Sequence, residues 1–170
     1  MWRLVSSPSP AIRTLFILRH AKAEQPDGVR DEDRQLTKRG RRAAERTGEL
    51  LADRLPDRIL SSSSARTRET VERFSKSAHY HGPVEYLDAL YLAEPAAYLA
   101  AVKRHGGNAE RLLLVGHNPG LEALVTRLTG ERVSLPTAAL VECTLDVRTW
   151  SDVTEQTSAE LTGISYPREE

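Results

Sequence analysis

Two uninterrupted apolar runs, TLFIL at residues 14–18 and RLLLVG at residues 111–116, limit the folds that this chain can adopt. A strand with one face in water is expected to alternate apolar and polar residues, and neither run does so. Short runs of this kind are typical of strands that are covered on both faces, as in parallel sheets. The two runs therefore predict a buried, mostly parallel sheet.

Helical patterns fill most of the sequence between the predicted strands. Thr37 can cap one helix, Pro95 can open another, and glycines at 106 and 130 can close two of them. The predicted order is strand 14–18, helix 37–55, strand 57–60, helix 67–78, strand 84–87, helix 95–106, strand 111–116, helix 121–130, strand 138–147 and edge strand 159–166. This alternation predicts a three-layer α/β/α sandwich with a mostly parallel central sheet.

The length of 170 residues suits a single domain, which we expect to span residues 13–170, with residues 151–170 supplying an edge strand and a tail. Residues 1–12 contain SSPSP and are expected to be a flexible leader. No segment approaches the roughly 20 apolar residues that span a bilayer, and nothing resembles a signal peptide. We therefore expect a cytoplasmic protein without a membrane partner.

Charge and cysteine content narrow the function further. Twenty-four Lys and Arg balance twenty-four Asp and Glu, so no global field favours nucleic acid, and any anion recognition must be local. Cys143 is the only cysteine, which excludes an intrachain disulfide and a thiolate zinc cluster. It lies in an apolar strand and is interpreted as a buried structural residue.

Polar residues gather where three predicted strands end: Arg19 and His20 after the first, Arg66 after the second, and His117 after the fourth. Ligands of open α/β sheets bind beyond the carboxyl ends of the strands. Each residue alone has an ordinary structural interpretation, but together they suit a phosphoryl group. Guanidinium groups can stabilise its oxygens, and a neutral imidazole is a competent nucleophile.

Other chemistries fit less well. Arginines beside both histidines would repel a divalent cation, and no carboxylate stands at ligand spacing, so neither a metal nor another cofactor is expected. The segment DEDR at residues 31–34 follows no strand and is interpreted as a solvated loop face rather than a magnesium site. No GK[ST] loop supports a nucleotide triphosphatase.

Four motifs in this order resemble those of the histidine phosphatase superfamily, also called phosphoglycerate mutase-like. They are LRHAK (18–22), LTKRG (36–40), SSSSARTRET (61–70) and GHNPG (116–120). The short length and the GHNP form are most similar to the small bacterial phosphohistidine phosphatases of that superfamily. The resemblance covers residues 14 to about 147 and implies the phosphoglycerate mutase-like fold.

The resemblance also implies roles for individual residues. His20 would be the nucleophile, Arg19 and Arg66 would clamp the phosphoryl oxygens, and His117 would complete the pocket. Arg34 looks like an additional phosphate-binding arginine, although a surface pair of Asp33 and Arg34 is an equally good account. Ser62 matches a loop serine of the family and is given only a supporting role.

One departure from the family concerns the proton donor. Mutases and broad phosphomonoesterases of the family place a glutamate in the stretch that corresponds to YLDALYLAEP, where this chain has only Asp88 and Glu94 nearby. An acid catalyst is typically worth about 10²–10⁴ in rate, and its absence should affect alkyl esters most. A phosphoramidate such as phosphohistidine needs less help.

Three functions stay open on the sequence. The first is a phosphatase that works through a covalent phosphohistidine on His20 and acts on phosphohistidine in a partner protein. The second is a small-molecule phosphomonoesterase or mutase with the same pocket. The third is a non-catalytic phosphate-binding regulator.

Overall fold

The computed structural model describes residues 12–167. Nearly all of the expected leader therefore lies outside the described residues. Ile12, its last member, instead begins the first strand. Among the described residues, no helix is both long enough and apolar enough to cross a membrane.

Six strands and four α-helices alternate as predicted, with three short 3₁₀ helices between them. The strands are β1 (Ile12–Arg19), β2 (Arg58–Ser62), β3 (Val84–Leu87), β4 (Arg111–Gly116), β5 (Leu140–Asp146) and β6 (Ala159–Ser165). The helices are α1 (Lys38–Leu51), α2 (Ala65–Ala78), α3 (Pro95–His105), α4 (Gly120–Thr129), η1 (Asp31–Asp33), η2 (Asp88–Leu90) and η3 (Trp150–Asp152).

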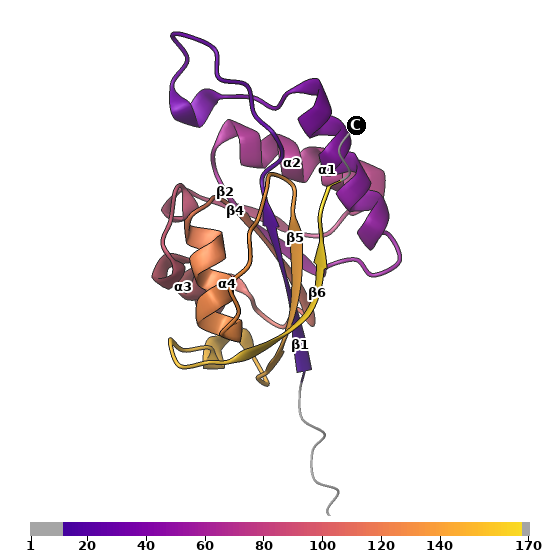
Figure 1. Ribbon diagram of the computed structural model, residues 1–170. Helices are drawn as coiled ribbons and strands as arrows, with labels where there is room; N and C mark the ends of the chain where they lie inside the picture. The colour runs from indigo at the N-terminus through magenta and orange to yellow at the C-terminus, as the bar shows by residue number, and fades with distance from the viewer. Residues whose placement is uncertain (1–11, 168–170) are drawn as a thin grey trace, which may run out of the picture.

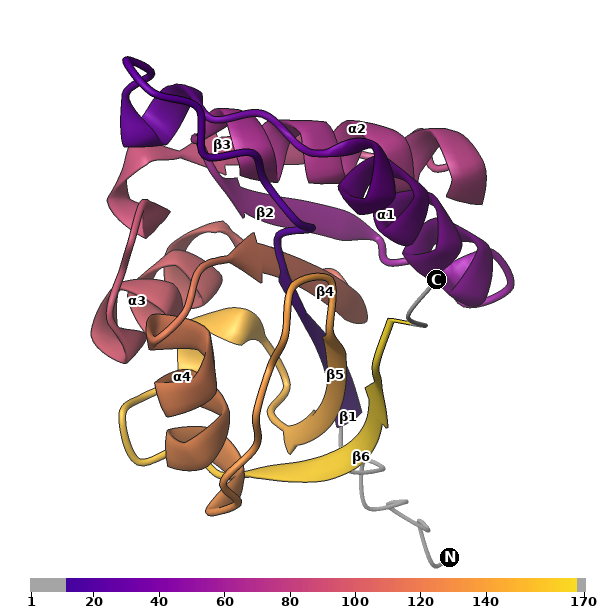
Figure 2. The same cartoon turned by 45° about the horizontal axis from the view of Figure 1, so that its top comes forward.

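The strands form one sheet in the order β3-β2-β4-β1-β5-β6. The first four strands of that order pair in parallel, while β5 is antiparallel to both β1 and β6. Helices α1 and α2 cover one face, and α3 and α4 cover the other (Figures 1 and 2). The predicted sandwich with a mostly parallel sheet and an edge strand near the C-terminus is confirmed.

The packing of β1 on both faces of the sheet explains why its sequence does not alternate apolar and polar residues. Leu15 and Ile17 belong to the core cluster on the α3 and α4 side, whereas Phe16 and Leu18 belong to the cluster beneath α1 and α2. All four side chains are buried. Since successive residues of a strand point to opposite faces, a strand covered on both sides needs an apolar residue at every position.

The start of α1 fixes the segment that follows β1. Thr37 caps the helix as predicted, because its hydroxyl oxygen accepts a hydrogen bond of 3.0 Å from the Gly40 amide. A Cβ atom added to Gly40 would lie 2.2 Å from the carbonyl oxygen of Lys22. Glycine therefore allows α1 to pack directly against the backbone just beyond His20.

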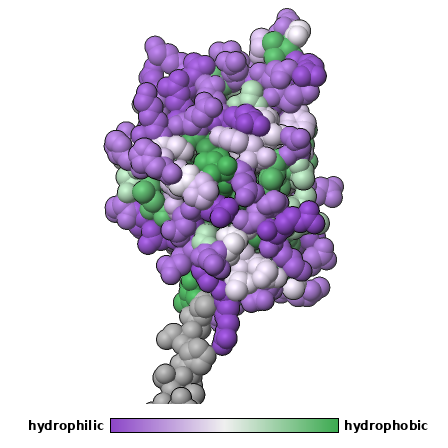
Figure 3. Space-filling model, turned by 180° about the vertical axis from the view of Figure 1, so that it is seen from behind, coloured by the Kyte–Doolittle hydropathy of each residue, from purple (hydrophilic) through white to green (hydrophobic). Residues whose placement is uncertain are grey.

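The outer surface carries no large apolar area on the side seen in Figure 3, where hydrophobic residues form small patches separated by hydrophilic ones.

Cys143 is buried in β5, and burial raises the pKa of its thiol to about 12, as expected for a structural cysteine.

Candidate active site

The candidate site lies where β1, β2 and β4 end side by side. In the parallel pair of β1 and β4, Arg19 stands opposite Gly116, so His20 and His117 follow at neighbouring positions. Strand β2 pairs with β4 as far as Ser61, and Ser62 comes next. The sheet order therefore brings together residues that are almost a hundred positions apart in sequence.

His20 is held with one ring nitrogen engaged. Its Nδ1 lies 2.8 Å from the carbonyl oxygen of Ala21, and because a carbonyl oxygen only accepts, Nδ1 carries the proton of the neutral ring. Nε2 then keeps its lone pair. The side chain is 7 % exposed, and burial, followed by the charges of Arg66 and Arg19, lowers its pKa to about 4. The ring is neutral at pH 7.

His117 faces His20, with ring centroids 5.3 Å apart. Its Nε2 lies 2.8 Å from the hydroxyl oxygen of Ser62, and its backbone amide donates a 3.0 Å hydrogen bond to the Tyr98 hydroxyl. Burial, then the positive charge that His20 and Arg66 can carry, lowers the pKa of His117 to about 3. Its Nδ1 has no hydrogen-bond partner among the described residues.

Arg19 and Arg66 each use only some of the N–H donors of their guanidinium groups in hydrogen bonds within the described chain. Arg19 donates from Nη1 to the Leu135 carbonyl oxygen at 2.9 Å. Arg66 donates from Nη1 to the Asp31 carbonyl oxygen at 2.7 Å and from Nη2 to the Asp31 carboxylate at 3.0 Å. In the described part of the chain, the Nε atoms of both arginines are buried without a partner. Buried donors left unpaired in this way are costly unless an acceptor occupies the site.

Arg34 joins this group through Asp31. Its Nε donates to the Asp31 carboxylate at 3.1 Å, whereas Asp33 pairs with Arg30 at 3.0 Å. The interpretation of Asp33 and Arg34 as a surface pair is therefore wrong. Asp31 also accepts a hydrogen bond from the Tyr91 hydroxyl, and this bond, with Arg66 and Arg34, lowers the pKa of Asp31 to about 2.

The five residues predicted to bind or attack the phosphoryl group, Arg19, His20, Arg34, Arg66 and His117, line one cavity of about 460 Å³. The cavity is lined by Arg19, His20, Lys22, Ala23, Gln25, Asp31, Arg34, Arg66, Leu92, His117, Asn118 and Thr137. Asp31 is the carboxylate in this set. Asp88 instead lines a neighbouring cavity, and Glu94 precedes the first residue of α3.

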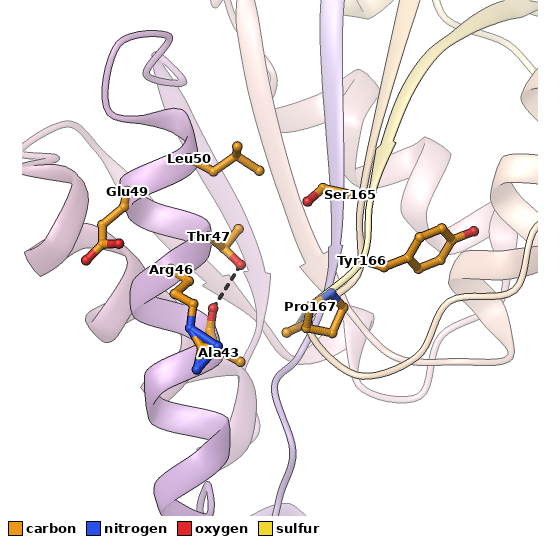
Figure 4. A pocket seen from close by; sticks show the side chains of 9 residues that line it. Ala43, Arg46, Thr47, Glu49, Leu50, Ser165, Tyr166 and Pro167 are labelled. Carbon is orange, nitrogen blue, oxygen red and sulfur yellow. Dashed lines mark hydrogen bonds between the residues drawn. The ribbon is translucent and has the colours of Figure 1, made fainter. Parts of the chain in front are cut away.

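A second cavity, of about 500 Å³, lies between α1 and the end of β6. Figure 4 shows the α1 side chains, including Arg46 and Leu50, across a gap from Ser165, Tyr166 and Pro167. Its lining contains neither of the two histidines, so this cavity is separate from the candidate active site.

Two contributors were missed from the sequence. Asp31 was assigned to a solvated loop face, but it bonds two of the cavity arginines. Tyr91 meets the His117 ring edge-on, at 5.5 Å between centroids, and bonds Asp31. A cue for Asp31 was its place three residues before Arg34, which allows an ion pair within one helical turn.

The layered sheet, with a cavity lined by histidines and arginines at the carboxyl ends of its strands, places the chain in the α/β class, and comparison with known proteins identifies its family. Residues 15–91 match the model of the histidine phosphatase superfamily (branch 1). The uncharacterized protein Rv1276c of Mycobacterium tuberculosis is 35 % identical over 164 residues, which cover 89 % of this chain and all of the relative.

Two solved structures are also similar, each of a "putative phosphohistidine phosphatase SixA". The one from Nakamurella multipartitia is 31 % identical, covers 94 % of this chain and 99 % of its own, and has a TM-score of 0.83. The one from Agrobacterium tumefaciens is 32 % identical, covers 91 % and 98 %, and has a TM-score of 0.75. The chain belongs to the histidine phosphatase superfamily, and its resemblance to these proteins supports phosphatase activity.

Proposed function

We propose that this protein hydrolyses phosphohistidine in a partner protein through a covalent phosphohistidine on His20. The observation that carries the proposal is the state of His20: Nδ1 is bonded to the Ala21 carbonyl oxygen, which leaves the lone pair on Nε2. The low pKa keeps that lone pair free at pH 7. Arg19 and Arg66 supply unpaired N–H donors for the phosphoryl oxygens beside it.

The reaction takes two displacements at phosphorus. In the first, Nε2 of His20 forms a bond to phosphorus while the bond from phosphorus to the substrate imidazole breaks. The electron pair leaves with that imidazole, whose other nitrogen carries a proton, so the ring departs neutral. In the second, water attacks the phosphorus, the bond to Nε2 breaks, and inorganic phosphate departs after the water loses its proton to the medium. Arg19, Arg66 and His117 stabilise charge on the equatorial oxygens in both steps.

The absence of a carboxylic acid from the described cavity lining supports a nitrogen-linked phosphate. An alkoxide leaving group needs a proton, and the carboxyl group in the lining, Asp31, is ionised because its pKa lies at about 2. An imidazole whose second nitrogen already carries a proton leaves as a neutral ring. The names of the two similar structures point to the same substrate.

A substrate panel at fixed pH tests the proposal. The panel contains a histidine-phosphorylated protein, a phosphoserine peptide and sugar phosphates. We expect kcat/KM to be at least about 10²-fold higher for phosphohistidine than for the phosphate esters. A factor of about 10² is the lower end of the rate loss that an ester suffers when the acid catalyst is missing. Preference for an ester would contradict the proposal and favour a small-molecule phosphomonoesterase.

Trapping of labelled phosphate tests the covalent step. Acid-labile label should appear on the wild-type protein and be lost in His20→Ala. His81→Ala is the matched control, because His81 is an exposed histidine outside the cavity lining. Rapid hydrolysis of the label would exclude a mutase, which must preserve its phosphoenzyme. Binding of phosphate without label or turnover would identify a non-catalytic regulator and overturn the proposal.

A further inference from the structure

Leu92 combines three unusual properties at the mouth of the active-site cavity. Its φ angle is +48°, in the left-handed region that leucine rarely adopts because Cβ crowds the backbone. Its side chain is 54 % exposed, and it lines the same cavity as His20. A strained backbone and an exposed apolar side chain at one position are both unfavourable for the folded protein alone.

The residues on either side hold Leu92 in this conformation. Leu90 and Ala93 are buried in the core beneath α3 and α4. The carbonyl oxygen of Ala93 would lie 1.8 Å from a Cβ atom added to Gly120, so the backbone there is tightly packed. Tyr91 is bonded to Asp31. With its neighbours fixed on both sides, the turn directs the side chain of Leu92 outward to the cavity mouth.

Leu92 differs in polarity from the rest of the described cavity lining. The deep residues, His20 and His117, are buried, and the lining is otherwise mainly cationic or polar. Leu92 is the one large aliphatic side chain in that lining. Leu92 is therefore the large aliphatic surface in the described lining that the group attached to a phosphoryl bound beside His20 could contact.

We propose that Leu92 is a specificity-determining residue that contacts the leaving group, namely the imidazole ring of a phosphohistidine. This inference rests on the proposed function. A ring that covers the exposed half of a leucine side chain removes that apolar surface from water, which favours the bound state. A substrate without a ring gains nothing from Leu92.

The test compares Leu92→Asn with the wild type on two substrates. Asparagine tolerates the left-handed conformation and removes the apolar contact. We expect kcat/KM to fall about tenfold for a histidine-phosphorylated protein, the loss that corresponds to half of a leucine burial. For phosphoramidate, whose leaving group is ammonia, we expect a change of less than about twofold. The melting temperature should not fall, because the backbone strain is relieved.

Two further variants sharpen the result. Leu92→Met should keep most of the activity on the phosphorylated protein, because the apolar contact is retained. Leu50→Asn is the matched control, since Leu50 is 51 % exposed on α1 in the other cavity, and it should change neither activity.

Equal losses on both substrates, or no loss on either, would overturn the role of Leu92 while leaving the phosphatase intact. Failure of the wild type to hydrolyse either compound would instead reject the proposed function, and the inference about Leu92 with it.

Discussion

Acidification should distinguish the two cavity histidines from ordinary ones. Exposed imidazoles titrate near pH 6.5, so at pH 5.5 about nine-tenths of them carry a proton. Burial and neighbouring charges place the pKa of His20 at about 4 and that of His117 at about 3. At pH 5.5 we therefore expect both rings to remain more than about nine-tenths neutral.

The same shifts make stability depend on pH. Between pH 6.5 and about 4, the unfolded chain binds protons at both histidines and the folded protein does not, so the free energy of unfolding falls as the pH falls. The contribution is fully present above pH 6.5. The slope for each histidine increases from about 0.7 kcal/mol per pH unit at pH 6.5, where the unfolded ring is half protonated, towards about 1.4 kcal/mol per pH unit, so acidification from pH 6.5 to 5.0 removes about 1.5–2 kcal/mol for each.

Urea unfolding at pH 6.5 and pH 5.0 measures this loss. His20→Asn removes one of the two buried titrating groups, so its free energy of unfolding should fall by about 1.5–2 kcal/mol less than that of the wild type. The exposed control His81→Asn should follow the wild type. Proton NMR of the ring Cε1–H groups reports the two titrations directly. An NMR midpoint near pH 6.5 for His20, or equal losses in His20→Asn and the wild type, would refute the electrostatic reasoning.

Two further predictions concern residues that support the site. Ser62→Ala removes the hydroxyl partner of His117 Nε2, so kcat should fall about tenfold with little change in KM, and urea unfolding should show a loss of about 1–3 kcal/mol because a buried polar group is left unpaired. Gly120→Ala places a Cβ atom against the Ala93 carbonyl oxygen, and it should destabilise the protein in thermal melts and lower activity. Gly163→Ala, where a Cβ atom meets nothing closer than 3.8 Å, should do neither.

The meeting of His20, Arg66 and His117 could be predicted because it depends on local patterns. Uninterrupted apolar runs predict strands covered on both faces, and such strands are typically parallel neighbours. Parallel strands end at the same edge, so residues that follow those runs come together whatever their separation in sequence. Which of these residues become neighbours depends on the strand order, and the adjacency of β2, β4 and β1 was not predicted from the sequence.

Asp31 and Leu92 could not be predicted in the same way. Asp31 begins the short helix η1 within a long polar segment, and its carboxylate is placed by Arg66 and Tyr91, which are 35 and 60 positions away. Leu92 sits in a left-handed turn that depends on contacts of its neighbours with α4 and with the loop. No local pattern encodes such contacts, and a lone leucine in a sequence is ordinarily assigned to the core.

The cavity is strongly positive although the net charge of the whole chain is zero. The lining contains four permanent cations and one carboxylate, namely Arg19, Lys22, Arg34, Arg66 and Asp31. This excess of positive charge helps to keep both imidazoles neutral. A phosphoryl dianion adds two negative charges within the same cavity, so its Coulomb effect on both rings has the opposite sign and raises their pKa values. In the proposed reaction the attacking nitrogen of His20 becomes bonded to phosphorus, so His117 would be the ring left to take up a proton and stabilise the transferring oxygens. Under that proposal, the arginines that help to keep His20 neutral would also bind the phosphoryl group, and the bound group would favour a charged His117.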